Sequence, residues 1–365
     1  MKLFEIPMLV TSLLGLCLLS GLDTPPAYAD FTFGEPVNVR SVIPALDPAH
    51  DSIDCFSHDG LEMYIESDAG GYGWWDLWVA RRASTDEDWG PPENLGSALN
   101  TPEAELAACI SADGLTLYFN STRSGGYGGA DIYMTTRATK NDPWGPPVNM
   151  GPKVNSSTGD GGPWISTDGL ELYFNSYLRA GGYGGFDIYV TRRATTDDPW
   201  AQSVNLGPVV NSAYNENSLS LSPDGLLLLF SEPYTTATPR PGGYGGADMW
   251  MTRRASLSDP WQAPVNLGPP VNGVGAGVIP RISPDGSTLY YIEYLGGTWE
   301  NWQAPILPVV DFYPDWTVEM KDFSKLAQYW GQDEPSVDIG PMPWGDGVVD
   351  MQDLAVLLEY WLSWY

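Results

Sequence analysis

A glycine-rich motif recurs through the middle of the chain and constrains its fold more than any other feature. Gly-Gly-Tyr-Gly-Gly-Ala-Asp-Ile-Tyr at residues 125–133 returns with small changes at 181–189 and 242–250, and in a degraded form at 70–78. Around each copy stand an Asp-Gly pair, an apolar segment such as Leu-Tyr-Phe, and a tryptophan. A chain of such units folds as stacked repeats, each burying an apolar face against its neighbour.

Five Asp-Gly pairs mark five units at intervals of 54, 55, 56 and 61 residues. The marker residues are Asp59, Asp113, Asp168, Asp224 and Asp285. After the second marker, Leu115, Leu117 and Phe119 alternate with Thr116 and Tyr118, which is typical of a half-buried strand. A short strand before each marker and two after the glycine motif bring the total to four per unit. The sequence therefore predicts an all-β, five-bladed propeller of four-stranded blades over residues 30–308.

The two ends of the repeat region predict how the ring closes. Residues 33–39 read as a fourth strand with no blade before it, whereas the last unit, residues 282–306, has a poorly marked fourth strand. We expect the N-terminal strand to complete the last blade, which removes an exposed sheet edge.

The repeats resemble the bacterial WD40-like propeller repeat of TolB-type proteins over about residues 31–308. The resemblance implies a recognition platform with no shared catalytic residue, so we predict none. Five units, where TolB itself has six, imply a narrow channel to which the binding habits of TolB do not transfer.

Charge and targeting signals limit the partners. The net charge of −29 disfavours nucleic acid and anionic membranes and favours cations and neutral ligands. Lys2, an apolar run over residues 8–22, and Ala27-Tyr28-Ala29 predict a signal peptide, residues 1–29, cleaved after Ala29. A lipid anchor on Cys17 is the alternative, disfavoured because Leu16 precedes it. With no later run long enough to span a bilayer, we expect a soluble extracellular or periplasmic protein.

Cys55 and Cys109 each stand four residues before an Asp-Gly pair, at equivalent places in neighbouring repeats. Such positions usually lie farther apart than the ~7 Å between Cα atoms that a disulfide tolerates. We predict two buried thiols rather than a disulfide.

The pattern changes after residue 308 to a duplicated loop followed by apolar residues at helical spacing. The acids that could supply ligands are Asp311, Asp315, Glu319 and Asp322 in the first copy and Asp338, Asp346, Asp350 and Asp353 in the second. Carboxylates alternating along a short loop suit Ca²⁺, which takes several oxygen ligands. The alternative is a metal-free helical pair whose acids cap helix N-termini.

This tail resembles a type I dockerin over residues 309–365, which implies Ca²⁺ binding, a cohesin-type protein partner, and a place in extracellular polysaccharide breakdown. By that resemblance, the partner-binding positions are Met320, Lys321, Gln328, Met351, Gln352 and Glu359. The tail departs from the pattern at Tyr313 and Trp316 in the first loop, and the second loop lacks an Asp at its expected start.

Four acids stand eight residues before their Asp-Gly markers: Asp51, Glu105, Asp160 and Glu216. Gly277 breaks this series in the fifth blade. At the start of the innermost strands, these carboxylates would surround the channel mouth and bind a cation or sugar hydroxyl groups. The alternative is that they accept hydrogen bonds from loop amides or from an arginine of the next blade.

The other repeated residues favour structural roles. We expect Asp76, Asp131, Asp187 and Asp248 to bind the amides of the glycine loops. The loop tyrosines, residues 72, 127, 183 and 244, could stack on sugars or pack on the adjacent blade. We assign the repeated tryptophans, residues 89, 144, 200 and 261, to the core or the seams between blades.

A glycoside hydrolase is the second hypothesis for the propeller. That chemistry needs two differentiated carboxyl groups, so it requires a break in the repeat symmetry. The first blade departs from the others, since it has Asp68 where the next two carry Arg123 and Arg179, and it adds Trp74 and Trp75.

Overall fold

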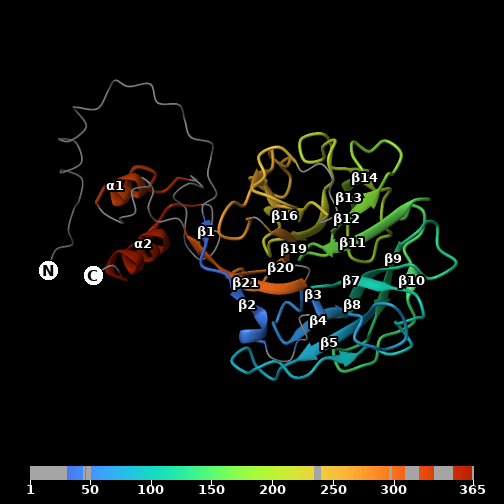
Figure 1. The fold of residues 1–365 in the computed structure, drawn as a ribbon. Coiled ribbons are helices and arrows are strands. Elements are labelled where there is room, and N and C mark those ends of the chain that lie inside the picture. The colour runs from blue at the N-terminus through green and yellow to red at the C-terminus, as the bar shows by residue number, and fades with distance from the viewer. Residues whose placement is uncertain are drawn as a thin grey trace.

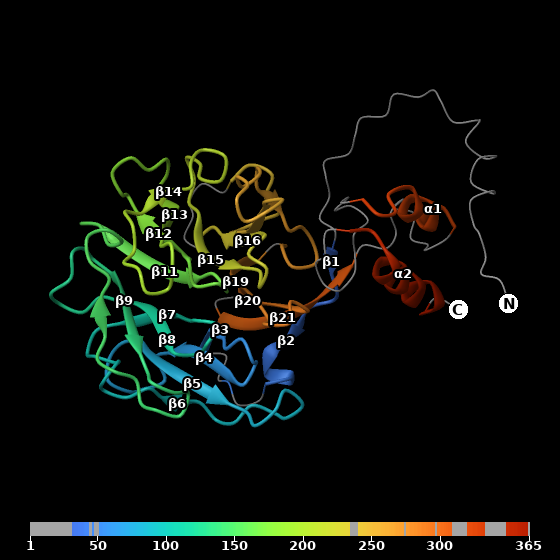
Figure 2. The same ribbon diagram turned by 180° about the vertical axis from the view of Figure 1, so that it is seen from behind.

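The computed structural model describes residues 31–43, 46, 51–233, 240–273, 275–295, 298–308, 320–332 and 348–363. The region before residue 31 lies outside this part of the chain, as do Asp311, Asp315, Glu319, Asp338 and Asp346. Residues 31–308 form a five-bladed β-propeller, and two short helices lie outside it (Figures 1 and 2). The predicted fold class is confirmed.

The first four blades are antiparallel sheets whose strands follow one another in sequence. Blade one contains β3 (Asp51–Phe56), β4 (Glu62–Ser67), β5 (Asp76–Arg81) and β6 (Glu93–Asn94). Blade two contains β7 (Glu105–Ile110), β8 (Thr116–Ser121), β9 (Asp131–Thr136) and β10 (Val148–Asn149). Blade three contains β11 (Gly159–Ile165), β12 (Glu171–Tyr177), β13 (Phe186–Arg192) and β14 (Val204–Asn205). Blade four contains β15 (Asn217–Leu221), β16 (Leu227–Ser231), β17 (Met249–Arg253) and β18 (Val265–Asn266).

The fifth blade joins the two ends of the propeller. It contains β19 (Ala276–Ile282), β20 (Thr288–Leu295) and β21 (Thr298–Pro308), and its outer edge is β1 (Phe31–Phe33) with β2 (Val37–Asn38). Phe33 is opposite Ile306, and Val37 is opposite Gln303. A 3-10 helix, Val39–Ser41, follows at once. The predicted closure by the N-terminal strand is confirmed.

The core lies between the faces of adjacent sheets, as the strand alternation indicated. One buried cluster joins Tyr64 and Leu77 of blade one to Leu117 and Phe119 of blade two. Another joins blade four to blade five and includes Phe31 and Phe33 of the closing strand. The apolar side chains therefore hold the ring together blade by blade.

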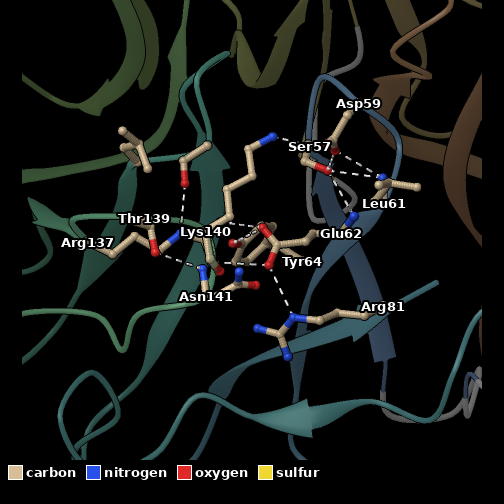
Figure 3. A network of polar contacts seen from close by, with 12 residues as sticks. Ser57, Asp59, Leu61, Glu62, Tyr64, Arg81, Arg137, Thr139, Lys140 and Asn141 are labelled. Carbon is tan, nitrogen blue, oxygen red and sulfur yellow. Dashed lines mark hydrogen bonds and ion pairs between the residues drawn. The ribbon is translucent and has the colours of Figure 1, made fainter. Parts of the chain in front are cut away.

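Repeated arginines explain the repeated tryptophans. Arg137 follows β9, donates Nε–H to the carbonyl of Gly114 in the Asp-Gly turn, and lies 4.4 Å from the ring centroid of Trp144. The same arrangement recurs for Arg82 over Trp89, Arg193 over Trp200 and Arg254 over Trp261. Arg137 also reaches Glu62 on the neighbouring blade (Figure 3). These tryptophans therefore brace the seams, as we predicted.

The glycine loops are held by their aspartates. Asp131 accepts hydrogen bonds from the backbone amides of Tyr127 and Gly128, and Asp76 and Asp187 do the same in their own loops. A Cβ atom on Gly128 would lie 1.9 Å from the carbonyl oxygen of Thr158 on the next blade, so only glycine fits there. The structural interpretation of these loops is confirmed, and the tip tyrosines are about half exposed.

The two helices pack on each other. Helix α1 (Met320–Gln328) and helix α2 (Met351–Ser363) share a small apolar cluster that includes Leu326, Val349 and Leu357. The backbone amide of Gly331 donates to the carbonyl of Val349, and the backbone amide of Val349 donates to the carbonyl of Gln332. Neither helix is long and apolar enough to cross a membrane.

Candidate functional site

Two adjoining cavities occupy the end of the channel where the innermost strands begin. The larger one, which we call the mouth cavity, measures about 530 Å³ and is bordered by blades one, four and five. The second, the channel cavity, measures about 400 Å³ and is bordered by the innermost strands of all five blades. Both include Glu66, Asn217 and Ile279, so they meet.

Three of the four predicted channel-mouth acids are buried and hydrogen-bonded within their own blades. Glu105 accepts from the amide of Thr101 and the hydroxyl of Ser121 at 2.7 Å each, and from Arg123 at 3.2 Å. Asp160 pairs with Arg179 and Glu216 with Arg240 in the same way. These partners match the alternative interpretation, except that each arginine comes from the same blade and not the next one.

Asp51 is different from the other three acids. It is only half-buried and lies on the mouth cavity, where Asp68 of the same blade also lies. The strand register corrects the predicted match of Asp68 with Arg123: Asp51 is opposite Ser67 as Glu105 is opposite Ser121, so the residue of blade one that aligns with Arg123 is Ala69. The departure of the first blade from the repeat pattern thus coincides with the larger cavity.

The innermost strands turn backbone groups toward the channel through bulges. Ala107, Gly162, Ser218 and Ile279 have positive φ at equivalent positions, six residues before their Asp-Gly markers. The amide of Ala107 donates to Glu66 of the preceding blade at 2.9 Å, and that of Ile279 donates to Ser231 at 3.3 Å. All four bulges border the channel cavity, and those at Ala107 and Ile279 also tie two blades together.

A buried charge cluster that sequence reasoning missed borders the channel cavity. The side chains of Asp54 and Glu66 lie within hydrogen-bonding distance of each other. Burial raises the pKa of both, that of Asp54 well above its usual range. Arg281 is buried beside them and donates to the carbonyls of Leu219 and Pro280.

A signal in the sequence could have revealed this cluster. The position of Asp54 in the repeat is held elsewhere by Ala108, Pro163, Leu219 and Pro280. The position of Arg281 is held by Cys55, Cys109, Trp164 and Ser220. A single charge at a position that is otherwise uncharged marks a break in the symmetry, which a search for repeated acids does not register.

The mouth cavity is acidic and partly aromatic. Its carboxyl groups belong to Asp51, Glu66, Asp68 and Glu232, and Trp75 and Trp299 add indole rings. Glu232 is 1% exposed; its Oε1 accepts from the amide of Arg240, whereas its buried Oε2 has no hydrogen-bond partner. Burial raises the pKa of Glu232. In the part of the chain that the structure describes, no three acidic, histidine or cysteine side chains are grouped to hold a metal ion.

The opposite end of the channel holds the two cysteines. Cys55 and Cys109 are buried, unbonded, and border a small cavity of about 70 Å³ with His58. Burial, and then the neighbouring Cys109, raise the pKa of the Cys55 thiol well above its usual range. The predicted buried thiols are confirmed, and the environment of Cys55 disfavours its reactive thiolate.

Only part of the predicted tail site is described. Asp353 is fully buried and accepts the amide of Asp350 at 2.6 Å, which caps the start of α2. Of the predicted partner-binding residues, Gln328, Met351 and Gln352 are exposed and Lys321 is half-buried. The side chains of Met320, Asp322 and Glu359 lie outside the described part.

The fold defines a class, the five-bladed β-propeller, and comparison with solved structures finds propellers. TolB from Acinetobacter baumannii is 15% identical over 72% of this chain and 56% of its own, with a TM-score of 0.46, so the match spans about half of that protein. An α-L-arabinofuranosidase from Lactobacillus brevis is 14% identical over 74% of this chain and 94% of its own, with a TM-score of 0.48. An endo-arabinase from Bacteroides thetaiotaomicron is 14% identical over 76% of this chain and 97% of its own, with a TM-score of 0.46.

The sequence matches no protein-family model and no curated protein sequence. At these identities, the structural likeness concerns the fold alone.

Proposed function

We propose that the protein is a secreted, non-catalytic recognition propeller that binds a saccharide in the mouth cavity. The observation that carries this proposal is the composition of that cavity, which combines carboxyl and amide groups with two tryptophans. Carboxylates and amides accept and donate hydrogen bonds to sugar hydroxyl groups, and indole faces cover the apolar faces of sugar rings. A volume of about 530 Å³ also lies within the range of ligand sites.

Binding to immobilised glycans, followed by calorimetry with the best ligand, tests the proposal. Trp75→Ala should weaken binding by about tenfold or more, because it removes a ring that borders the cavity. Trp74→Ala is the matched control, since Trp74 is 81% exposed and does not border the cavity. No binding to any glycan, or equal loss from both variants, would contradict the proposal.

A glycoside hydrolase is the second candidate, favoured by the raised pKa of the buried Glu232, because a general acid needs such a shift. Asp54 and Glu66 do not suit as the catalytic pair, since side chains within hydrogen-bonding distance lie closer than the ~5 Å or more that glycosidases keep. Release of reducing sugar that Glu232→Gln abolishes would establish hydrolysis and replace the non-catalytic proposal.

For the tail, the proposal is a dockerin-like module that binds Ca²⁺ and a cohesin-type partner. The packing of α1 on α2 and the paired backbone hydrogen bonds around Val349 support a duplicated loop–helix arrangement. One observation fits the metal-free alternative equally well: Asp353 accepts the amide of Asp350 and so caps the start of α2. Calcium-dependent capture of a cohesin domain by the full-length protein tests the module.

A further inference from the structure

Blades three and five carry a matched pair of aromatic residues at the same place in the fold. In blade three, Tyr177 on β12 is opposite Phe186 on β13, with ring centroids 4.7 Å apart and ring planes at 43°. In blade five, Tyr294 on β20 is opposite Trp299 on β21, with ring centroids 4.8 Å apart and ring planes at 46°. Each tyrosine stands nine residues after the Asp-Gly marker of its blade, so the two pairs occupy equivalent positions.

The scaffold does not need these aromatic pairs. The position nine residues after the marker is held by Thr122 in blade two and by Pro233 in blade four, and both blades form the same four-stranded sheet. Tyr177 is 46% exposed and Tyr294 is 38% exposed, so neither ring fills the core. Exposed aromatic rings that the repeat itself does not require are typical of a surface that binds a ligand.

The two pairs stand at the two connected cavities. Tyr177 and Phe186 border the channel cavity, and Trp299 borders the mouth cavity. Blade four lies between blades three and five, and its residues Asn217 and Ser218 border both cavities. The cavities therefore lead from one aromatic pair to the other along the start of β15.

The wall between the aromatic pairs is polar. Asn120, Asn175 and Asn217 bring side-chain amides to the channel cavity, and the positive φ of Ser218 and Ile279 brings backbone groups to it. Sugar rings have apolar faces that stack on aromatic rings and hydroxyl groups that bind amides and backbone groups. The two aromatic pairs lie on different blades, so a single sugar ring cannot stack on both.

We infer that the two cavities together bind one linear oligosaccharide, with one of its rings against Trp299 and another against Tyr177. This inference rests on the proposed saccharide binding and adds that the ligand is a chain held at two places. Once the first ring is bound, contact of the second ring is an intramolecular step. Affinity is therefore expected to rise with the length of the chain.

Calorimetry on the full-length protein tests this inference with linear oligomers of glucose, mannose, xylose and arabinose, from two to six units long. In the series that binds best, we expect the six-unit oligomer to bind at least about tenfold more tightly than the two-unit oligomer. Tyr177→Thr, which matches Thr122 of blade two, should remove that gain and leave binding of the two-unit oligomer unchanged. Trp299→Ala should weaken binding at every length. Tyr127→Thr is the matched control, because Tyr127 is 51% exposed and borders neither cavity.

The outcomes separate this inference from the proposal on which it rests. Affinity that does not depend on chain length, or a gain with length that Tyr177→Thr leaves intact, would overturn the inference while saccharide binding stands. Binding of immobilised branched glycans but of no linear oligomer would do the same. If Tyr177→Thr lowers the melting temperature and weakens oligomers of every length equally, the aromatic pair is structural and the inference fails. Absence of binding to every glycan would overturn both proposals.

Discussion

Glu62 of the first blade and Arg137 of the second form a buried ion pair with a nitrogen–oxygen distance of 2.5 Å (Figure 3). The hydroxyl of Tyr64 also donates to Glu62 at 3.0 Å. Although burial alone would raise the pKa of Glu62, the hydrogen bonds and charge of Arg137 lower it. Arg137→Ala should destabilise the protein by about 3–5 kcal/mol, because it removes the buried cation from Glu62 and leaves that carboxylate with only Tyr64 and the half-exposed Arg81. Chemical denaturation measures this change.

Arg81 provides the control on the same carboxylate. It also pairs with Glu62, at 3.1 Å, but its side chain is 45% exposed. Arg81→Ala should cost less than about 1 kcal/mol, as solvent screens exposed pairs. Equal effects of the two substitutions would show that the seam does not depend on the buried pair.

Deleting residues 31–38 should open the ring. The deletion removes β1 and β2, uncovers the edge of β21, and takes Phe31 and Phe33 out of a buried cluster. We expect a lower melting temperature and aggregation through the exposed edge. A protein that lacks only residues 1–30 is the control, and identical melting of the two would contradict closure by these strands.

Glu216 should make stability depend on pH. Burial raises its pKa from 4.5 to about 7, despite hydrogen bonds from Ser212 and the charge of Arg240. Between these values, the folded protein keeps a proton that the unfolded chain releases, so stability falls as pH rises from about 4.5 to 7, by on the order of 2–3 kcal/mol. Glu216→Gln should flatten that part of the curve of melting temperature against pH, and Glu93→Gln should not. If Glu216→Gln leaves the dependence of melting temperature on pH unchanged, other titrating groups cause that dependence.

If the tail binds Ca²⁺, Asp353→Ala should cost more calcium affinity than Asp322→Ala. The first loop has Tyr313 and Trp316 where a ligand and a glycine are usual. At 100 times its Kd, calcium would stabilise the folded tail by about 2.7 kcal/mol. Titration of calcium into the full-length protein, after a chelator has removed bound metal, measures the affinities by calorimetry.

Asp353→Asn distinguishes metal binding from helix capping. Asparagine can still accept the amide of Asp350, so it preserves the cap while removing a negative charge. Calcium affinity lost in both Asp353 variants supports a ligand role. Absence of calcium heat in the parent protein, or full affinity in Asp353→Asn, would point to capping alone.

The scaffold was predictable from the sequence because its residues repeat. Residues of the same type as Asp131, Arg137 and Trp144 recur at similar spacing along the chain. They make the same contacts in each repeat, in the glycine loop, at the Asp-Gly turn and at the seam between blades. The cavities were not predictable in the same way. Asp54 accepts the amide of Ala108 on the next blade and lies near Arg281 of the fifth, and Glu232 borders a cavity that blades one, four and five share. These surroundings depend on how strands distant in sequence pack around the channel.

Phe33 and Ile306 lie opposite each other near the two ends of the propeller, and that register has a consequence for how the chain matures. Blades one to four are built from consecutive strands, so each can assemble as it emerges during synthesis. In the fifth blade, β1 is synthesised first but has no partner until β21, the last strand of the propeller, has been made. Until then the nascent ring has two unpaired edges, and joining them carries the largest loop-closure entropy in the molecule. Closure of this last gap is therefore expected to set the folding rate, and the growing chain is most open to mispairing just before it.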